Sequence, residues 1–173
     1  MPKATMDAIA LLKADHRKVE DLFKKYEKSR GKKAEIARQI CLELTIHTVI
    51  EEEIFYPACL EAVEHDMLDE AQVEHDGAKV LIAEIEAGSP DDHYYDAKVK
   101  VLSEEIKHHV KEEEQRGGIF SQARDSDIDM KYLGEQMIAR KKELMEDYKK
   151  NGMPKPRTRS MKGIQLEHDQ PTV

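Results

Sequence analysis

The sequence predicts an all-α protein: a four-helix bundle followed by an additional C-terminal helix and a flexible tail. Three observations lead to this prediction. Charged residues make up 37% of the 173 residues and aromatic residues only 5%, a balance that suits long amphipathic helices. Apolar residues recur at alternating steps of three and four, which is the spacing along one face of a helix. Sustained apolar/polar alternation, the pattern of a half-buried strand, is absent from the sequence.

Gly and Pro residues divide the chain into five expected helices. The first starts near Thr5, a candidate N-cap, and Pro57 should bend the second or end its regular part. Gly88-Ser89-Pro90 is a strong helix breaker after the third. The expected helices cover residues 5–29, 33–64, 68–87, 91–117 and 127–150. We therefore expect one helical domain over residues 1–150, with its core at 5–120, and a disordered basic tail over residues 151–173.

Each of the first four expected helices carries a histidine within its apolar stripe. These histidines are His16, His47, His75 and His109. In the first helix, for example, Leu12 and Val19 flank the histidine at steps of four and three. The second and fourth helices add Glu51 and Glu113, each four residues after its histidine and therefore on the same helix face.

This pattern occurs twice along the chain. A single histidine on one helix is followed, on the next, by His-x-x-x-Glu: His16 precedes His47 by 31 residues, and His75 precedes His109 by 34. Two helical hairpins of similar pattern can pack with approximate two-fold symmetry. Such packing would bring the four histidines to one level of the bundle.

The six polar residues in these apolar stripes need a binding partner, because polar groups are costly to bury alone. A single histidine on an apolar face is more often a satisfied core residue, but four histidines and two glutamates buried together without partners would be costly. Metal cations remove this cost, and a mixed nitrogen and oxygen set suits Fe, Mn, Zn or Cu rather than Mg or Ca. The predicted ligands are His16, His47, Glu51, His75, His109 and Glu113.

A ferritin-like site is an alternative, because Glu105 and His108 form a Glu-x-x-His motif. It disagrees with the first and third helices, whose single ligand positions hold His16 and His75 rather than Glu. On a helix His108 projects about 100° away from His109, so we expect it at the surface. We expect Glu52, Glu53, Glu112 and Glu114 either to face solvent or to accept hydrogen bonds from the ligand imidazoles.

These motifs resemble the hemerythrin-like (HHE cation-binding) family over about residues 5–120. The matching pieces are Asp15-His16, HTVIEEEIFYP at 47–57, Glu74-His75, and HHVKEEEQRGGIF at 108–120. The resemblance implies an up-down-up-down bundle around two non-haem iron ions joined by an oxo or hydroxo bridge. The six matching residues would bind them, and both glutamates would bridge. Zn or Mn occupancy is an alternative.

The sequence departs from the oxygen-carrying members of that family at Lys79, where those members have a fifth histidine. One more coordination position would then be open than in an oxygen carrier. Tyr56, near the Pro57 bend, is a candidate for an additional ligand or a near neighbour of the metal, although the sequence alone favours a core tyrosine.

The expected function is a binding protein that takes up O₂, NO or a related small ligand for storage, sensing or a stress response. A His-rich site should hold Fe(II) more readily than the Glu-rich sites of ferritin-like oxygenases. The alternatives are an enzyme that decomposes peroxide or reduces NO, and an iron storage or sensing protein. Whether the protein is an enzyme stays undecided at this point.

Net charge limits the partners that we expect. At −8, the chain should repel nucleic acids and anionic membranes. The fifth helix or the basic stretch at 149–162 could contact a protein partner, although a solubilising tail is the simpler interpretation. The apolar run at the N-terminus is too short for a signal peptide. Cys41 and Cys59 should lie too far apart on one helix to bridge, so we expect a cytoplasmic protein.

Overall fold

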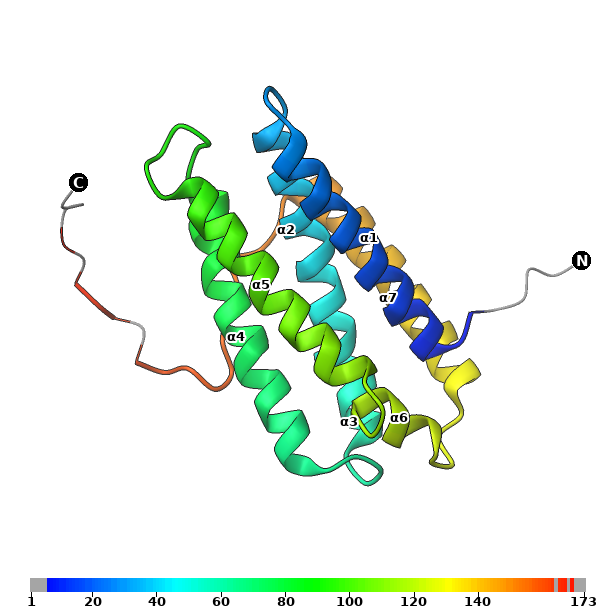
Figure 1. Cartoon of the computed structure of the whole chain (residues 1–173). Coiled ribbons are helices and arrows are strands. Elements are labelled where there is room, and N and C mark those ends of the chain that lie inside the picture. The colour runs from blue at the N-terminus through cyan, green and yellow to red at the C-terminus, as the bar shows by residue number, and fades with distance from the viewer. Residues whose placement is uncertain (1–5, 164, 168, 170–173) are drawn as a thin grey trace, which may run out of the picture.

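The computed structural model describes residues 6–163, 165–167 and 169, and its regular elements in this range are all helical. Four long helices, α1, α2, α4 and α5, run side by side, and α7 lies along α1 and α2 (Figure 1). The elements are α1 (Ala8–Lys28), α2 (Lys33–Ile50), the π-helix η1 (Glu51–Phe55), α3 (Tyr56–Cys59), α4 (His65–Ala87), α5 (Tyr95–Glu114), α6 (Ile119–Arg124) and α7 (Met130–Asn151). The predicted four-helix bundle with an additional helix is confirmed.

Two of the long helices begin directly after an aspartate whose side chain caps them. Asp7 caps α1, because its carboxylate accepts a hydrogen bond from the Ala10 amide at 2.8 Å. Asp129 does the same for α7 through the Tyr132 amide at 3.0 Å. The predicted cap Thr5 lies outside the described residues, and the first helix starts at Ala8.

The second expected helix is interrupted where Pro57 enters it. Proline lacks an N–H and its ring clashes with the carbonyl four residues earlier, so the regular hydrogen-bond ladder cannot continue through it. The chain forms the five-residue π-helix η1 just before the proline, and the Tyr56 amide donates to the Glu51 carbonyl five residues back. This local widening places Glu51 and Tyr56 on the inner side of the bundle, where both are buried.

The apolar core consists of two clusters with a polar layer between them. One cluster gathers side chains such as Leu12, Ile50 and Phe120, and the other gathers Val19, Leu44 and Leu102. On α1, His16 falls between Leu12 of the first cluster and Val19 of the second. The same change of cluster occurs around the histidines of α2 and α4. The apolar stripes predicted on the helices therefore form the core, and the histidines interrupt this core at one level of the bundle.

The segment after α7 has no regular secondary structure in its described residues, as expected. We predicted disorder throughout this tail, but residues 157–160 lie against α4. The buried Asp76 carboxylate accepts hydrogen bonds from the amides of Arg159 and Ser160, at 2.9 and 2.6 Å. A buried carboxylate needs donors, and the tail backbone supplies them.

Two further findings complete the fold. Cys41 and Cys59 are buried free thiols, as their predicted separation requires. In the part of the chain that the structure describes, none of the helices combines the length and apolarity needed to cross a bilayer.

Candidate metal centre

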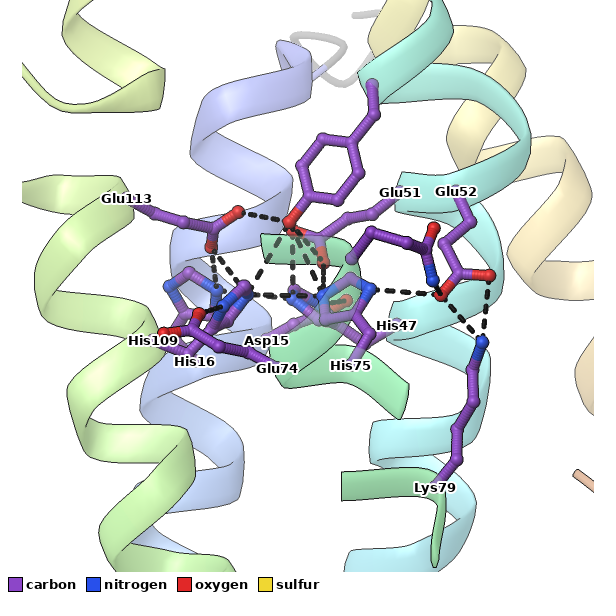
Figure 2. Close-up of polar contacts among 12 residues, drawn as sticks. Asp15, His16, His47, Glu51, Glu52, Glu74, His75, Lys79, His109 and Glu113 are labelled. Carbon is purple, nitrogen blue, oxygen red and sulfur yellow. Dashed lines mark hydrogen bonds and ion pairs between the residues drawn. The ribbon is translucent and has the colours of Figure 1, made fainter. Parts of the chain in front are cut away.

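The structure brings all six predicted ligands into the polar layer between the two core clusters (Figure 2). Each is at most 5% exposed, and Glu51 and Glu113 are fully buried. The six residues are His16 on α1, His47 on α2, Glu51 on η1, His75 on α4, and His109 and Glu113 on α5. The structure thus brings together the six side chains that the sequence spacing singled out.

The histidines meet in pairs, one pair from each helical hairpin. The Nε2 atoms of His16 and His47 are 3.2 Å apart, and those of His75 and His109 are also 3.2 Å apart. The imidazole rings of each pair are tilted by 60° and 56° rather than stacked. Each pair thus directs two ring nitrogens toward one point.

The two glutamates connect the histidine pairs. Glu51 Oε1 lies 3.2 Å from His47 Nε2, and Glu51 Oε2 lies 3.1 Å from His75 Nε2. Glu113 Oε2 lies 3.2 Å from His16 Nε2 and 3.6 Å from His109 Nε2. Each carboxylate therefore reaches both histidine pairs, as a bridging ligand would.

A carboxylate stands behind each imidazole. Nδ1 of His16 donates to Glu114 at 2.6 Å and Nδ1 of His109 to Glu74 at 2.6 Å; the corresponding partners of His47 and His75 are Asp15 at 3.3 Å and Glu52 at 3.2 Å. Ionised carboxylates only accept hydrogen bonds, so Nδ1 carries the proton. Whenever the imidazole is neutral, this tautomer leaves the Nε2 lone pair free and directed into the centre, as in many metal sites.

The pattern of these acceptors repeats the internal duplication. Asp15 and Glu74 each precede a histidine but accept from the histidine of the neighbouring helix. Glu52 and Glu114 each follow a glutamate of the centre and accept from the other hairpin. From the sequence alone, Glu52 and Glu114 were expected either to face solvent or to accept such hydrogen bonds, and Asp15 and Glu74 had no role beyond the family resemblance.

Electrostatics at the centre favours ionised carboxylates. Burial opposes ionisation of Glu51, but His47 and His75 outweigh it and hold its pKa well below the ordinary value. Burial likewise opposes protonation of His47 and His75, yet Glu51 raises the pKa of His47 to about 10 and, together with Glu52, that of His75 to about 9. In the metal-free protein, protons on these imidazoles therefore balance the buried negative charge that bound cations would otherwise balance.

The donors fit metal cations on a separate observation. Glu51 Oε1 and Glu113 Oε2 are fully buried, and no group that the structure describes meets the geometry of a hydrogen bond to them, although a histidine Nε2 atom lies 3.2 Å from each. Unpaired buried carboxylate oxygens are costly, and a coordinated cation removes that cost. Donor atoms of His16, His47, Glu51 and Glu113 all lie within 4.8 Å of one another, and so do those of Glu51, His75 and His109. Two such groups that share Glu51 suit two cations.

Tyr56 lies at the centre rather than in the apolar core alone. Its hydroxyl donates to Glu113 Oε1 at 2.8 Å and lies 3.4 Å from His75 Nε2. Burial, together with the Glu113 and Glu51 carboxylates, raises its pKa well above the ordinary value, so the phenol holds its proton here. Its role as an additional ligand or near neighbour of a metal stays a prediction.

Lys79, at the position where the resemblance to oxygen-carrying family members would place a fifth histidine, turns away from the centre. Its ammonium group pairs with Glu52 at 2.7 Å and Asp76 at 3.2 Å, as Figure 2 shows for Glu52. The sequence did not indicate this orientation, nor the stacking of Phe120 on His16 with ring centroids 5.7 Å apart. Phe120 belongs to α6, a short helix that carries the apolar residues after Gly117-Gly118 but was not predicted.

Two known proteins are similar to this chain. A curated relative from Nostoc sp., a DNA nickase, is 31% identical over 114 residues, which are 65% of this chain and 32% of the relative. The chain thus spans about a third of that relative's length. A crystal structure of a hemerythrin HHE cation binding domain-containing protein from Mycobacterium kansasii shares the fold, with a TM-score of 0.71 at 22% identity, covering 85% of this chain and 94% of that one.

The family model of the hemerythrin HHE cation binding domain matches residues 7–116, which is more than half of the chain and includes all six predicted ligands. Members of this family bind metal cations, and the buried histidines and glutamates described above provide the donors. The chain therefore belongs to the hemerythrin HHE cation-binding domain family.

Proposed function

We propose that this protein is a non-haem di-iron protein that binds O₂, NO or a related small ligand for storage, sensing or a stress response. The observation that carries the proposal is the pair of donor groups that share Glu51, each large enough to hold one ion. His16, His47, Glu51, His75, His109 and Glu113 would be the ligands. When bound, the irons would supply redox-active positions at which such small ligands can bind.

The choice of iron rests on the donor set. Imidazole and carboxylate donors together suit Fe, Zn and Mn, and four neutral imidazoles leave less negative charge than a Glu-rich site. The lower negative charge favours Fe(II), the state that binds O₂ and NO. Zn or Mn occupancy is an outcome that metal analysis would detect.

The chain's own residues prepare the site for a small ligand. Carboxylates behind the four imidazoles fix the ring orientations, and the Tyr56 hydroxyl holds Glu113. A cavity of about 20 Å³ adjoins all four histidines and is otherwise lined largely by apolar side chains such as Val19, Leu44 and Ile106. A space of this size holds about one water-sized molecule. It therefore favours a diatomic ligand over a larger substrate.

Two other functions are compatible with the same centre. Peroxide decomposition or NO reduction would make the protein an enzyme. In that case Tyr56 would be the candidate catalytic residue, because its hydroxyl could donate a proton or become a metal ligand in place of the missing fifth histidine. Iron storage or sensing would need the donors alone. DNA nicking belongs to the Nostoc relative, and the net charge of −8 gives no support for extending it to this chain.

One experiment separates these functions. The iron-loaded protein is reduced without oxygen, exposed to air, and followed by visible absorption. A charge-transfer band that forms in air and disappears under argon supports reversible binding, whereas rapid oxidation with peroxide turnover supports the enzyme. Retention of iron with no response to O₂, NO or peroxide supports storage or sensing. Metal analysis that finds zinc alone would overturn the di-iron proposal.

Partners and location complete the proposal. We propose a cytoplasmic protein, supported by the buried free thiols of Cys41 and Cys59. A protein partner could use the outer face of α7, where Tyr132 and Ile138 are exposed, or the basic tail. Neither nucleic acid nor membrane is expected, given the negative charge.

A further inference from the structure

The four carboxylates behind the imidazoles differ in what faces their outer side. Three of them are paired with a Lys or Arg side chain. Asp15 pairs with Lys141, Glu52 with Lys79 and Arg159, and Glu114 with Arg17. Glu74 forms no ion pair with any Lys or Arg among the described residues, and its outer partner is a histidine. A cation that approaches the centre therefore meets a fixed positive charge at three positions and none at Glu74.

Glu74 belongs to a second group of potential metal donors. Its Oε2 accepts from His109 Nδ1 at 2.6 Å, while its Oε1 lies 3.4 Å from His108 Nε2. His108 Nε2 also lies 3.1 Å from Glu112 Oε1. Donor atoms of Glu74, His108 and Glu112 all lie within 4.8 Å of one another. The His108 side chain is 64% exposed and that of Glu74 only 24%, so the group extends from solvent toward the centre.

A cavity borders both this group and the inner centre, although His108 itself does not line it. It has a volume of about 110 Å³, and its lining includes Glu74 and Glu112 of the outer group and His109 and Glu113 of the inner centre. Glu113 is fully buried, and its Oε2 atom has no hydrogen-bond partner in the described structure. Glu113 lines the cavity, and a bound cation would satisfy this carboxylate oxygen.

Charge along the cavity also favours a cation. Glu70 joins the three carboxylates already named, and none of the lining residues, all of them in the described part of the chain, is Lys or Arg. A cleft lined by one sign of charge concentrates ions of the opposite sign and raises their rate of association. Imidazole together with carboxylates selects a transition-metal cation rather than Mg²⁺ or Ca²⁺.

We propose that Glu74, His108 and Glu112 form an outer site that takes up a divalent transition-metal cation and passes it along this cavity to the inner centre. The proposal rests on the proposed metal-binding function of that centre. It assigns a role to the exposed His108, which would otherwise only form surface ion pairs with Glu74 and Glu112. Glu74 is the link, because it contacts the outer His108 and the inner His109 at once.

The test follows Co²⁺ uptake by metal-free protein in a stopped-flow spectrometer, with final metal content measured separately. The variant carries His108→Ala and Glu112→Ala, which leave Glu74 and all six inner ligands intact. The control carries Asp91→Ala and His93→Ala, an exposed pair in the α4–α5 loop that removes the same two group types. Far-UV circular dichroism checks that all three proteins keep their helices.

We expect the His108→Ala, Glu112→Ala variant to load about tenfold more slowly, within the range of electrostatic steering, and to reach the wild-type metal content. The control should load at the wild-type rate. Calorimetry should also detect one weak additional Co²⁺ site in loaded wild type that the variant lacks. Equal loading rates in variant and wild type, or an unchanged additional site, would overturn the outer site. If wild type binds no Co²⁺ at the inner ligands yet the variant still loses the weak site, the proposed function fails and the outer site stands.

Discussion

The two helical hairpins of this bundle contribute matching donors to the candidate centre, but the rest of the chain covers them differently. Hairpin α1–α2 lies under α7, whose Lys141 pairs with Asp15 and whose Arg140 pairs with Glu53. Among the described residues, hairpin α4–α5 has no such helix over Glu74, and its outer face carries the exposed His108. The repeated ligands therefore determine which metal chemistry is available. If the proposed outer site is correct, the difference in cover determines the side from which a cation reaches the centre.

The largest expected effect removes the residue that joins the two halves. Glu51→Ala should abolish retention of both metal ions, because Glu51 reaches His47 in one hairpin and His75 in the other. Glu53→Ala is the matched control, since Glu53 lies on the same π-helix but pairs with Arg140 outside the centre. Iron content after loading and desalting measures the result. Full iron content in Glu51→Ala would show that Glu51 is not a shared ligand.

A second prediction concerns protons in the metal-free protein. The Glu51 carboxylate raises the pKa of His47 to about 10 and helps to raise that of His75 to about 9, although burial opposes both shifts. A raised folded-state pKa stabilises the fold below the unfolded value of 6.5, and this stability is lost as pH rises through 9 to 10. The melting temperature of chelator-treated protein should therefore fall between about pH 6.5 and 10.

Bound metal should flatten this pH dependence, because the histidines then no longer hold protons. Thermal melts of loaded and metal-free protein at the same pH values make the comparison. A melting temperature of the metal-free protein that stays level or rises across this range would contradict the assignment.

The third prediction compares the acceptors of the two hairpins. Asp15→Asn and Glu74→Gln each remove a charged partner of an imidazole, and such changes typically weaken metal binding by about 10–100-fold. Only Asp15→Asn also leaves a cation, Lys141, without its partner, so it alone should destabilise the metal-free protein clearly. Competition with a chelator measures affinity, and urea unfolding measures stability. Equal losses of stability would remove the distinction that we draw between the covered and open halves.

Much of this arrangement follows from sequence periodicity, and the remainder depends on packing. The steps of three and four place His16, His47, His75 and His109 at one level, and their partners Glu51 and Glu113 follow from the i, i+4 rule. That Asp15 accepts from His47 rather than from its neighbour His16 depends on how α1 lies against α2, which no local pattern encodes.

Contacts between distant segments were beyond prediction for the same reason. The turn of Lys79 toward Glu52 depends on where α4 sits beside the π-helix, and the docking of residues 157–160 depends on the buried Asp76. Pro57 did predict an irregularity, although a proline alone does not distinguish a kink from the π-helix found here.

The smallest expected effects come from two helical glycines, one in each region. A methyl group at Gly134 of α7 would collide with the backbone at the start of α1, reaching 2.8 Å from the Ala8 nitrogen and closer still to the Met6 carbonyl oxygen. Gly134→Ala should therefore destabilise the fold by about 1–3 kcal/mol.

At Gly77 of α4 the nearest atom would be Glu105 Oε2 at 3.8 Å, so the methyl group fits. Gly77→Ala should stabilise by about 0.5–1 kcal/mol through better helix propensity. Urea unfolding of both variants measures the two changes in the free energy of unfolding. We expect opposite signs, because α7 packs closely against α1 at Gly134 whereas space is open beside Gly77 on α4. Destabilisation of similar size in both would mean that the second hairpin is packed as tightly as the first.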